Sequence, residues 1–563
     1  MRQRKVGIHA RELTQRRAHV LSILGLVLAA TALIVLAQVV SEKSSIPAAA
    51  LLTVAGLAVS TSSLPDIVLD PELVLTLVIP PLLYSAALNS SLVAIRRNVW
   101  TILSLSVALV VVTASIVGVG LALLIPGATL AAGMALGAAV APPDPVAALA
   151  VGRRAGIPPK LITLIEGEGL LNDATALTML TVAATAIASQ DMTFTHAGGL
   201  FVLAAVGGVI VGCAIALVIR FVQKFLGDAL LLNVVSLATP FVAYVAAEEV
   251  HASGVLAVVV AALFIGHDTR HAVSGASRLQ TGAVWRLIDL LLEGFVFLLI
   301  GEQLPTVIEG LAAYPLTTVV GAVAVTLAGV LLVRPVWLLG TEAVARMVDR
   351  SSSRSSSRSS RLSGREVVVM SWAGTRGVIT VAAVFSLPLT TESGEPFEIR
   401  NLLLFCAFVV VLVTVVAQGM TFAPLVRLLN VRADPAAESR LRNEARVGVT
   451  KAALQQLDHI ADEEKLDDDG RALMRRELDE RIDRYNRRLD HLDETNDDAP
   501  VISPEQQAAT TVRRRLIDAQ REELVRWRDC GRLPDAGMRS LEHELDHEEH
   551  SFKQHPDETD QPG

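Results

Sequence analysis

The segment Glu166-Gly-Glu-Gly-Leu-Leu-Asn-Asp173 places three carboxylates in a stretch that is otherwise apolar and long enough to cross a bilayer. Ionisable groups are costly at membrane depth and usually mark a path for ions or protons. Asp173 follows Lys160 by thirteen residues, which is roughly 20 Å along a helix and near the middle of the hydrocarbon core. A carboxylate at that depth can exchange a proton for a metal cation, so Asp173 is the first candidate site residue.

A second candidate lies in Ala139-Val-Ala-Pro-Pro-Asp144-Pro-Val146, again inside an apolar stretch. Each proline removes a backbone donor and clashes with the preceding turn, so three of them predict an interrupted helix. Transporters use such interruptions as cation sites, because free carbonyl oxygens then lie beside a carboxylate. Asp144 could equally cap the second half of the helix, and the two roles are compatible.

Glu168 and Asn172 are four residues apart and share one face of a predicted helix. Arg376 lies deep in another apolar run, Ser371-Trp-Ala-Gly-Thr-Arg-Gly-Val378, and needs a counter-charge there. We expect Glu168 to be that partner, because a buried arginine favours a carboxylate in a fork geometry. Arg376 could alternatively snorkel to the interface, and Glu166 could be a simple helix-end charge.

Composition divides the chain into two unlike parts. It has 563 residues, is 52% hydrophobic and has a mean hydropathy of +0.49, which is too apolar for a soluble globular protein. From residue 432 onward there are 22 Lys and Arg against 33 Asp and Glu, a net charge of −11, whereas the remainder carries +3. The three cysteines are scattered and form neither a disulfide framework nor a metal-binding spacing. A membrane body followed by an acidic tail is indicated.

The apolar blocks predict an all-α membrane protein with about thirteen transmembrane helices. Two of these spans are interrupted, one around Asp144 and one around Arg376, and they occupy corresponding positions seven spans apart. This is the pattern of two inverted repeats with broken crossing helices. The predicted spans lie near residues 18–40, 46–62, 72–88, 101–125, 130–152, 161–188, 198–223, 226–247, 252–267, 285–303, 314–340, 366–389 and 400–429.

Arginine and lysine gather in the loops that follow odd-numbered spans, which predicts that these loops and the tail face the cytoplasm. Thirteen spans then put the basic N-terminal segment 1–17 outside, against its own charge, so twelve spans with an inside N-terminus is the alternative. We expect a transmembrane domain over 18–430, a Ser/Arg low-complexity cytoplasmic loop at 351–365 and a charged helical cytoplasmic tail over 431–563.

Four motifs together resemble the monovalent cation:proton antiporters of the sodium/proton exchanger type, in their bacterial form. The resemblance covers about residues 18–430. The motifs are Ile79-Pro-Pro-Leu-Leu83, Pro143-Asp-Pro-Val-Ala147, Glu166-Gly-Glu-Gly-Leu-Leu-Asn-Asp173 and Trp372-Ala-Gly-Thr-Arg-Gly377.

The resemblance implies a homodimer whose core domain moves against a dimerisation domain. It also implies cation binding by Asp173 and Asp144, support of the site by Asn172, and pairing of Glu168 with Arg376. An Asn-Asp pair goes with electroneutral exchange in this family. Two family hydroxyls are replaced here, by Pro143 and Gly169, which leaves the ligand number and the cation preference open.

The predicted function is antiport of Na⁺, or of Li⁺ or K⁺, against H⁺ across the plasma membrane by alternating access, for pH and sodium homeostasis. The alternatives are a K⁺/H⁺ antiporter and an ion-responsive sensor that acts through the tail. No nucleophile–base pair, metal motif or phosphate loop supports an enzyme. The expected partners are Na⁺, H⁺, the lipid bilayer and a second copy of the chain, with no cofactor and no nucleic acid.

Overall fold

The computed structural model describes residues 25–549, with gaps at 26, 45, 62–73, 190–193, 227, 273–274, 352–361, 389, 391–396, 465, 495–503, 531–536, 539–540, 543 and 547–548. The basic segment 1–17 and most of the Ser/Arg loop therefore lie outside the described residues. Every element of regular secondary structure within them is helical. The chain divides into two compact units, residues 1–432 and 433–563.

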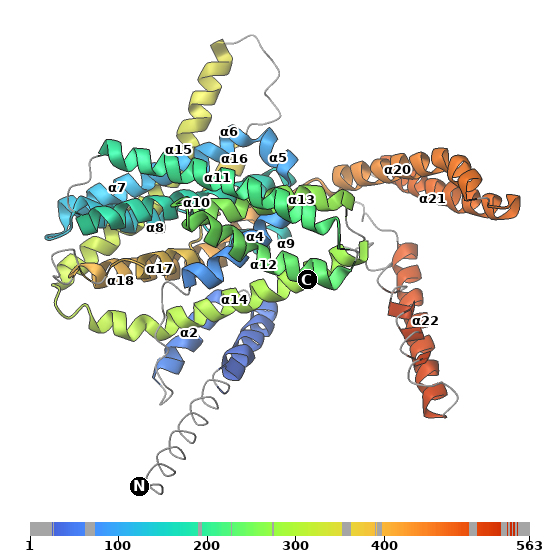
Figure 1. The fold of residues 1–563 in the computed structure, drawn as a ribbon, viewed down its shortest axis with the longest axis horizontal. Coiled ribbons are helices and arrows are strands. Elements are labelled where there is room, and N and C mark those ends of the chain that lie inside the picture. The colour runs from blue at the N-terminus through green and yellow to red at the C-terminus, as the bar shows by residue number, and fades with distance from the viewer. Residues whose placement is uncertain are drawn as a thin grey trace, which may run out of the picture. The chain divides into compact units, whose positions relative to one another are not determined.

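The first unit is a bundle of helices of very different lengths (Figure 1). A helix over residues 27–43 comes first. It is followed by α2 (Ala48–Ser60), η1 (Val74–Val78), α4 (Ile79–Asn89), α5 (Leu92–Arg97), α6 (Val99–Leu103), η2 (Ser104–Ala108), α7 (Leu109–Leu124), α8 (Leu130–Val140), α9 (Pro145–Arg154), α10 (Pro159–Ser189), α11 (Phe194–Gln223), α12 (Ala229–Glu248), α13 (Gly254–Ala272), α14 (Gly275–Glu309), α15 (Leu316–Ser351), α16 (Gly364–Trp372), α17 (Val378–Phe385), α18 (Arg400–Val413), η4 (Thr414–Gln418) and α19 (Gly419–Leu429).

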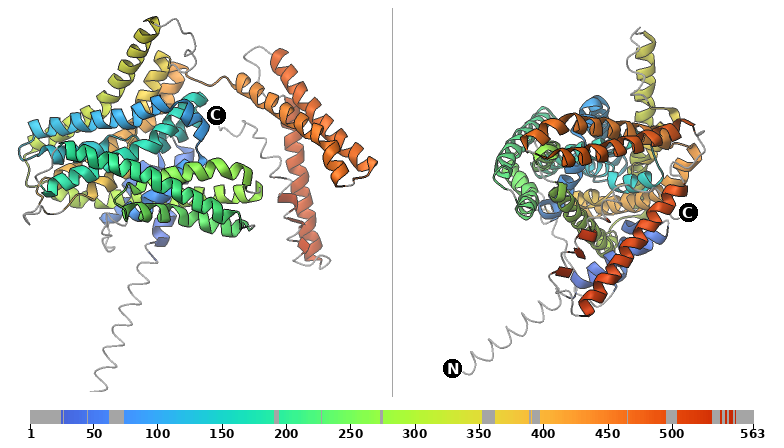
Figure 2. Two further views of the ribbon diagram at one scale, coloured as in Figure 1. Left: turned by 45° about the horizontal axis from the view of Figure 1, so that its top comes forward. Right: turned by 90° about the vertical axis from the view of Figure 1, so that its right-hand side faces the viewer.

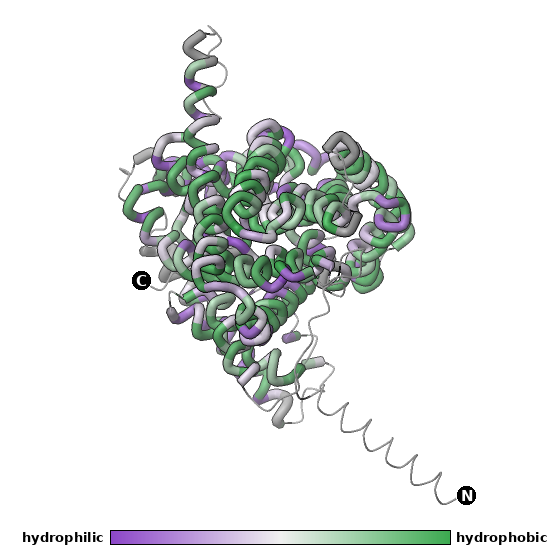
Figure 3. The backbone as a smooth tube through the Cα atoms, turned by 90° about the vertical axis from the view of Figure 1, so that its left-hand side faces the viewer, coloured by the Kyte–Doolittle hydropathy of each residue, from purple (hydrophilic) through white to green (hydrophobic). Residues whose placement is uncertain are grey.

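Six helical stretches among the described residues are long and apolar enough to cross a membrane, and hydrophobic residues dominate most of the helical tubes (Figure 3). They are Val99–Leu124, Pro159–Ile187, Gly198–Gln223, Ala229–Glu248, Leu316–Val344 and Arg400–Leu429. Four further apolar helices are shorter, namely Ala48–Ser60, Thr76–Asn89, Leu130–Val140 and Gly254–His267. The fold is thus all-helical with several apolar helices.

The helix Leu130–Val140 is short because it is one half of an interrupted span, and the two interrupted spans each divide into halves of eight to eleven residues. Helix α14 is long, but it carries Arg286, Asp289 and Glu293 among its apolar residues. A full count of thirteen spans and the relation of the two halves by inverted symmetry remain predictions.

Close packing around α7, α8 and α10 holds the site. Helices α7 and α8 pack where Gly118 and Gly133 face each other, and a side chain on Gly133 would meet the backbone of Gly118. Small residues of this kind let helix backbones approach closely in a membrane. Helix α10 packs in turn against α8, α9 and η2, so its middle is enclosed.

The second unit begins with two antiparallel helices, α20 (Pro435–Glu463) and α21 (Asp468–Glu494), which lie side by side (Figure 2). Asp434 caps the start of α20 by accepting hydrogen bonds from the N–H groups of two following residues. Exposed ion pairs link the two helices, from Arg475 to Asp458 at 2.8 Å and from Arg471 to Asp462 at 2.5 Å. Helix α22 (Pro504–Asp529) follows.

Candidate functional site

The interruption around Asp144 is present as predicted. Helix α8 ends at Val140 and α9 begins at Pro145, because the prolines between them cannot continue the helical hydrogen bonds. Asp144 Oδ1 accepts a hydrogen bond from the backbone N–H of Val146 at 2.9 Å. Asp144 is therefore the N-cap of α9, so the capping role weighed from the sequence is confirmed beside the broken helix.

The interruption around Arg376 is also confirmed, and the two broken segments bind each other. Helix α16 ends at Trp372 and α17 begins at Val378. The backbone N–H of Asp144 donates to the carbonyl of Thr375 at 2.6 Å, and Thr375 Oγ1 donates to the carbonyl of Asp144 at 3.1 Å. Two non-helical stretches, 231 residues apart in the chain, thus satisfy each other's backbone groups.

Arg376 is only 2% exposed, so it does not snorkel to an interface. Its Nε donates to the carbonyl of Val140 at 2.9 Å, and its Nη2 donates to the carbonyl of Ala141 at 3.0 Å. Its Nη1 donates to the carbonyl of Gly374. The last carbonyls of a helix lack intrahelical donors and carry partial negative charge, so Arg376 satisfies the open end of α8.

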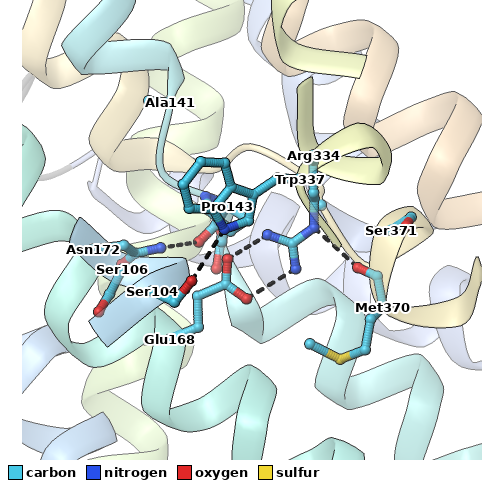
Figure 4. A network of polar contacts seen from close by, with 12 residues as sticks. Ser104, Ser106, Ala141, Pro143, Glu168, Asn172, Arg334, Trp337, Met370 and Ser371 are labelled. Atoms are coloured by element: carbon cyan, nitrogen blue, oxygen red, sulfur yellow. Dashed lines mark hydrogen bonds and ion pairs between the residues drawn. The ribbon is translucent and has the colours of Figure 1, made fainter. Parts of the chain in front are cut away.

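Glu168 pairs with Arg334, and the predicted pairing with Arg376 was wrong (Figure 4). Arg334 Nη2 donates to Glu168 Oε2 at 2.9 Å, and Arg334 Nη1 contacts Glu168 Oε1. Arg334 Nε also donates to the carbonyl of Met370 at 2.9 Å. The reason for the error is that the hydrogen bonds of Arg376 go to backbone carbonyls, which leaves the carboxylate to the arginine of α15.

Asn172 ties α10 to the first broken segment. Its Nδ2 donates to the carbonyl of Pro143 at 2.9 Å, and the residue is completely buried (Figure 4). Among the described residues no donor reaches Asn172 Oδ1. A buried acceptor without a donor is costly, so this oxygen is suited to a ligand that the protein does not itself supply.

Asp173 lies next to Asn172 on α10 and is 6% exposed. Its carboxylate is close enough to that of Asp144 for the two charges to interact. Two buried like charges repel strongly at low dielectric, so a proton or a cation between them is stabilising. The structure thus brings together Asp144, Asn172 and Asp173, and it pairs Glu168 directly with Arg334 instead of Arg376.

Helix α14 contributes further acidic residues near the crossing of the broken helices. The carboxylate of Glu293 interacts electrostatically with those of Asp144 and Asp289. Ser85 Oγ, from α4, donates to Asp289 Oδ2 at 2.6 Å. Asp289 and Glu293 are four residues apart and share a face of α14, so acidic side chains extend from the crossing of the broken helices onto this helix.

Within the described part of the chain, no group of three or more His, Cys, Asp or Glu residues could hold a metal ion. Two carboxylates and an amide oxygen are ligands of the kind that suits a hard monovalent cation.

The sequence model of the family described as "Sodium/hydrogen exchanger, transmembrane" matches residues 27–428. An uncharacterised Na⁺/H⁺ exchanger of Mycobacterium tuberculosis is 32% identical, and the match covers 86% of this chain and 88% of that protein. A sodium, potassium, lithium and rubidium/H⁺ antiporter of Bacillus subtilis is 33% identical over 62% of this chain and 53% of its own length.

A solved structure shares the fold. The sodium proton antiporter MjNhaP1 of Methanocaldococcus jannaschii superposes with a TM-score of 0.58 at 18% identity. The superposition covers 72% of this chain and 98% of that protein. At this identity the likeness concerns the arrangement of the helices.

Proposed function

The chain belongs to the sodium/hydrogen exchanger family, and from this premise we propose that it is a secondary active antiporter that exchanges one Na⁺ for one H⁺. The exchange takes place across the plasma membrane by alternating access and serves pH and sodium homeostasis. Na⁺ and H⁺ are the transported substrates, and no resident cofactor takes part.

The observation that carries the proposal is the position of Asp173, buried beside Asp144 where the two broken helices cross. Asp173 binds either the cation or a proton and never both, so competition for one charged group couples the two fluxes. Asp144, as N-cap of α9, holds its carboxylate at the crossing, and Asn172 Oδ1 supplies a further oxygen.

The charges around this site support electroneutral exchange. Arg334 neutralises Glu168, and an amide rather than a second carboxylate precedes Asp173. When one Na⁺ and one H⁺ replace each other at Asp173, the charge of the occupied site is the same in both directions and no net charge is moved. The membrane potential therefore has little effect on the rate in this proposal.

A K⁺/H⁺ antiporter is the second candidate, because the Bacillus subtilis relative carries sodium, potassium, lithium and rubidium in its name. Pro143 and Gly169 replace two residues that carry hydroxyl groups in the family. The site therefore lacks two oxygen atoms that could favour one alkali cation over another. Comparing Na⁺, Li⁺ and K⁺ on purified protein separates the two candidates.

The membrane arrangement is part of the proposal. The arginine-rich loops and the tail face the cytoplasm, as the distribution of positive charge favours. The chain works as a homodimer in the bilayer. A sensor that signals through the tail is disfavoured, because the tail shows neither a nucleotide-binding nor a DNA-binding motif.

Asp173→Asn in everted membrane vesicles tests the function, since the amide keeps the shape of the carboxylate and removes its charge. We expect Na⁺-dependent proton flux to disappear. Asp228→Asn is a matched control, because Asp228 caps α12 away from the site and asparagine is also a good N-cap. Persistent Na⁺-dependent flux in Asp173→Asn would contradict the proposal.

A further inference from the structure

An ion pair between Arg153 and Glu166 lies at one end of the face of α10 that carries Asp173. Arg153 Nη2 contacts Glu166 Oε1 at 2.5 Å. The side chain of Arg153 is 62% exposed and that of Glu166 is 24% exposed. Neither residue takes part in the crossing of the broken helices, and the sequence left Glu166 undecided between the path and a helix-end charge.

Glu166 and Asp173 are seven residues apart on α10. Seven residues turn a helix by about 700°, which is within about 20° of two full turns, so the two carboxylates share a face roughly 10 Å apart. Asp173 is 6% exposed and Leu170, one turn before it, is 2% exposed, whereas the side chain of Glu166 is 24% exposed. The part of this face around Asp173 is therefore buried, and Glu166 is its carboxylate that reaches solvent.

Helix α9 runs along the same stretch in the opposite direction. Asp144 caps one end of α9 and Arg153 lies at the other, nine residues or roughly 13 Å further on. The ring of Pro145 fills the space in which Gly169 lacks a side chain, so the two helices are in contact between the two acidic positions. Helices α9 and α10 thus bring together two pairs of residues, Asp144 with Asp173 at the buried end of α9 and Arg153 with Glu166 at its more exposed end.

The charge at this end is unfavourable for an approaching cation, because Arg153, Arg154 and Lys160 gather within eight residues. Glu166 is the carboxylate that offsets them on the face leading to Asp173. A partly exposed ion pair adds little to folding stability, so it can open without endangering the fold.

We propose that Glu166 is the outer cation-attracting residue of the path to Asp173, and that Arg153 is its resident counter-charge, which an entering cation displaces. The inference rests on the proposed antiport. Glu166 then affects the access of Na⁺ to the site, and the exchange of Na⁺ for H⁺ at Asp173 is unchanged. Arg153 weakens Na⁺ entry by occupying the carboxylate, and it keeps Glu166 from trapping the ion.

The test measures proton flux against Na⁺ concentration in everted vesicles at one pH. Glu166→Gln is expected to raise the half-saturating Na⁺ concentration about two- to fivefold with an unchanged maximal rate, and Arg153→Gln to lower it by a similar factor. Both effects should shrink at high ionic strength, since exposed charges are screened. Arg97→Gln, an exposed arginine at the end of α5, is the matched control for loss of one positive charge.

The exchanged pair Arg153→Glu with Glu166→Arg separates this role from a structural tie. It keeps an ion pair between α9 and α10 but places the guanidinium on the Asp173 face, so the half-saturating Na⁺ concentration should stay at least as high as in Glu166→Gln. Two results would overturn this inference and leave the proposed antiport standing. One is a wild-type half-saturating Na⁺ concentration in the exchanged pair, and the other is a wild-type half-saturating Na⁺ concentration in both single variants. Absence of Na⁺-dependent flux from wild-type vesicles would overturn the proposed antiport and this inference with it.

Discussion

Glu168 and Arg334 form a two-point ion pair at the centre of the helical bundle, with Arg334 Nη2 2.9 Å from Glu168 Oε2. Their side chains are 1% and 4% exposed. The pair joins α10 to α15, and the third donor of the guanidinium group reaches α16 through the carbonyl of Met370. Three helices around the site thus depend on one charged contact.

Glu168→Ala is expected to destabilise the protein by about 3–5 kcal/mol, because it leaves Arg334 buried without its counter-charge. Thermal unfolding of the purified protein in detergent measures the loss. Replacing both residues by methionine should recover much of it, since the buried charge is then removed as well. A Glu168→Ala protein with the melting temperature of the wild type would show that the pair is dispensable.

The sequence predicted the parts of the site that depend on local chemistry. Three prolines cluster around Asp144 and two glycines flank Arg376, so both interruptions could be predicted from neighbouring residues, although single prolines and glycines elsewhere lie inside continuous helices. The partner of Glu168 depends instead on which helices are adjacent in space. Arg334 was missed, although it is the sole charged residue between Glu309 and Glu342 and could have been singled out for that reason.

Gly377→Ala should impair exchange while leaving the fold intact, because a Cβ at this position would overlap the carboxylate of Asp144. Asp144 must move aside, and a displacement of about 1 Å at a site can cost on the order of a hundredfold in rate. We expect Na⁺-dependent proton flux in vesicles to fall at least roughly tenfold.

The control for that substitution is Gly340→Ala in α15, where an added Cβ meets nothing within 4 Å. Its flux should equal that of the wild type when both are normalised to the amount of protein in the membrane. Equal flux in Gly377→Ala and Gly340→Ala would mean that Asp144 does not need its present position.

Gly169→Ser restores a family hydroxyl, yet we expect it to be unfavourable in this chain. The ring of Pro145 occupies the space that a side chain at residue 169 would need. Overpacking of this kind costs about 1–3 kcal/mol, so the melting temperature should fall. Gly199→Ser in α11, with no atom within 4 Å of the added Cβ, serves as the comparison, and an equal effect of the two substitutions would argue against the clash.

A chain that stops after Arg432 should retain Na⁺-dependent proton flux. Residues 1–432 form a compact unit of their own, and every residue of the site lies within it. Val431 is 6% exposed and packs with the end of α19, where Asn430 adopts the left-handed conformation that ends a helix, so the truncation keeps this packing. The tail helices α20 and α21 bind each other through their own ion pairs, and they contain none of the site residues. Flux per amount of membrane protein, measured over a range of pH values, is the test.

An antiporter should keep its exchange, with any change confined to the pH at which it is active. Complete loss of flux from a normally inserted protein would assign the tail a direct part in transport.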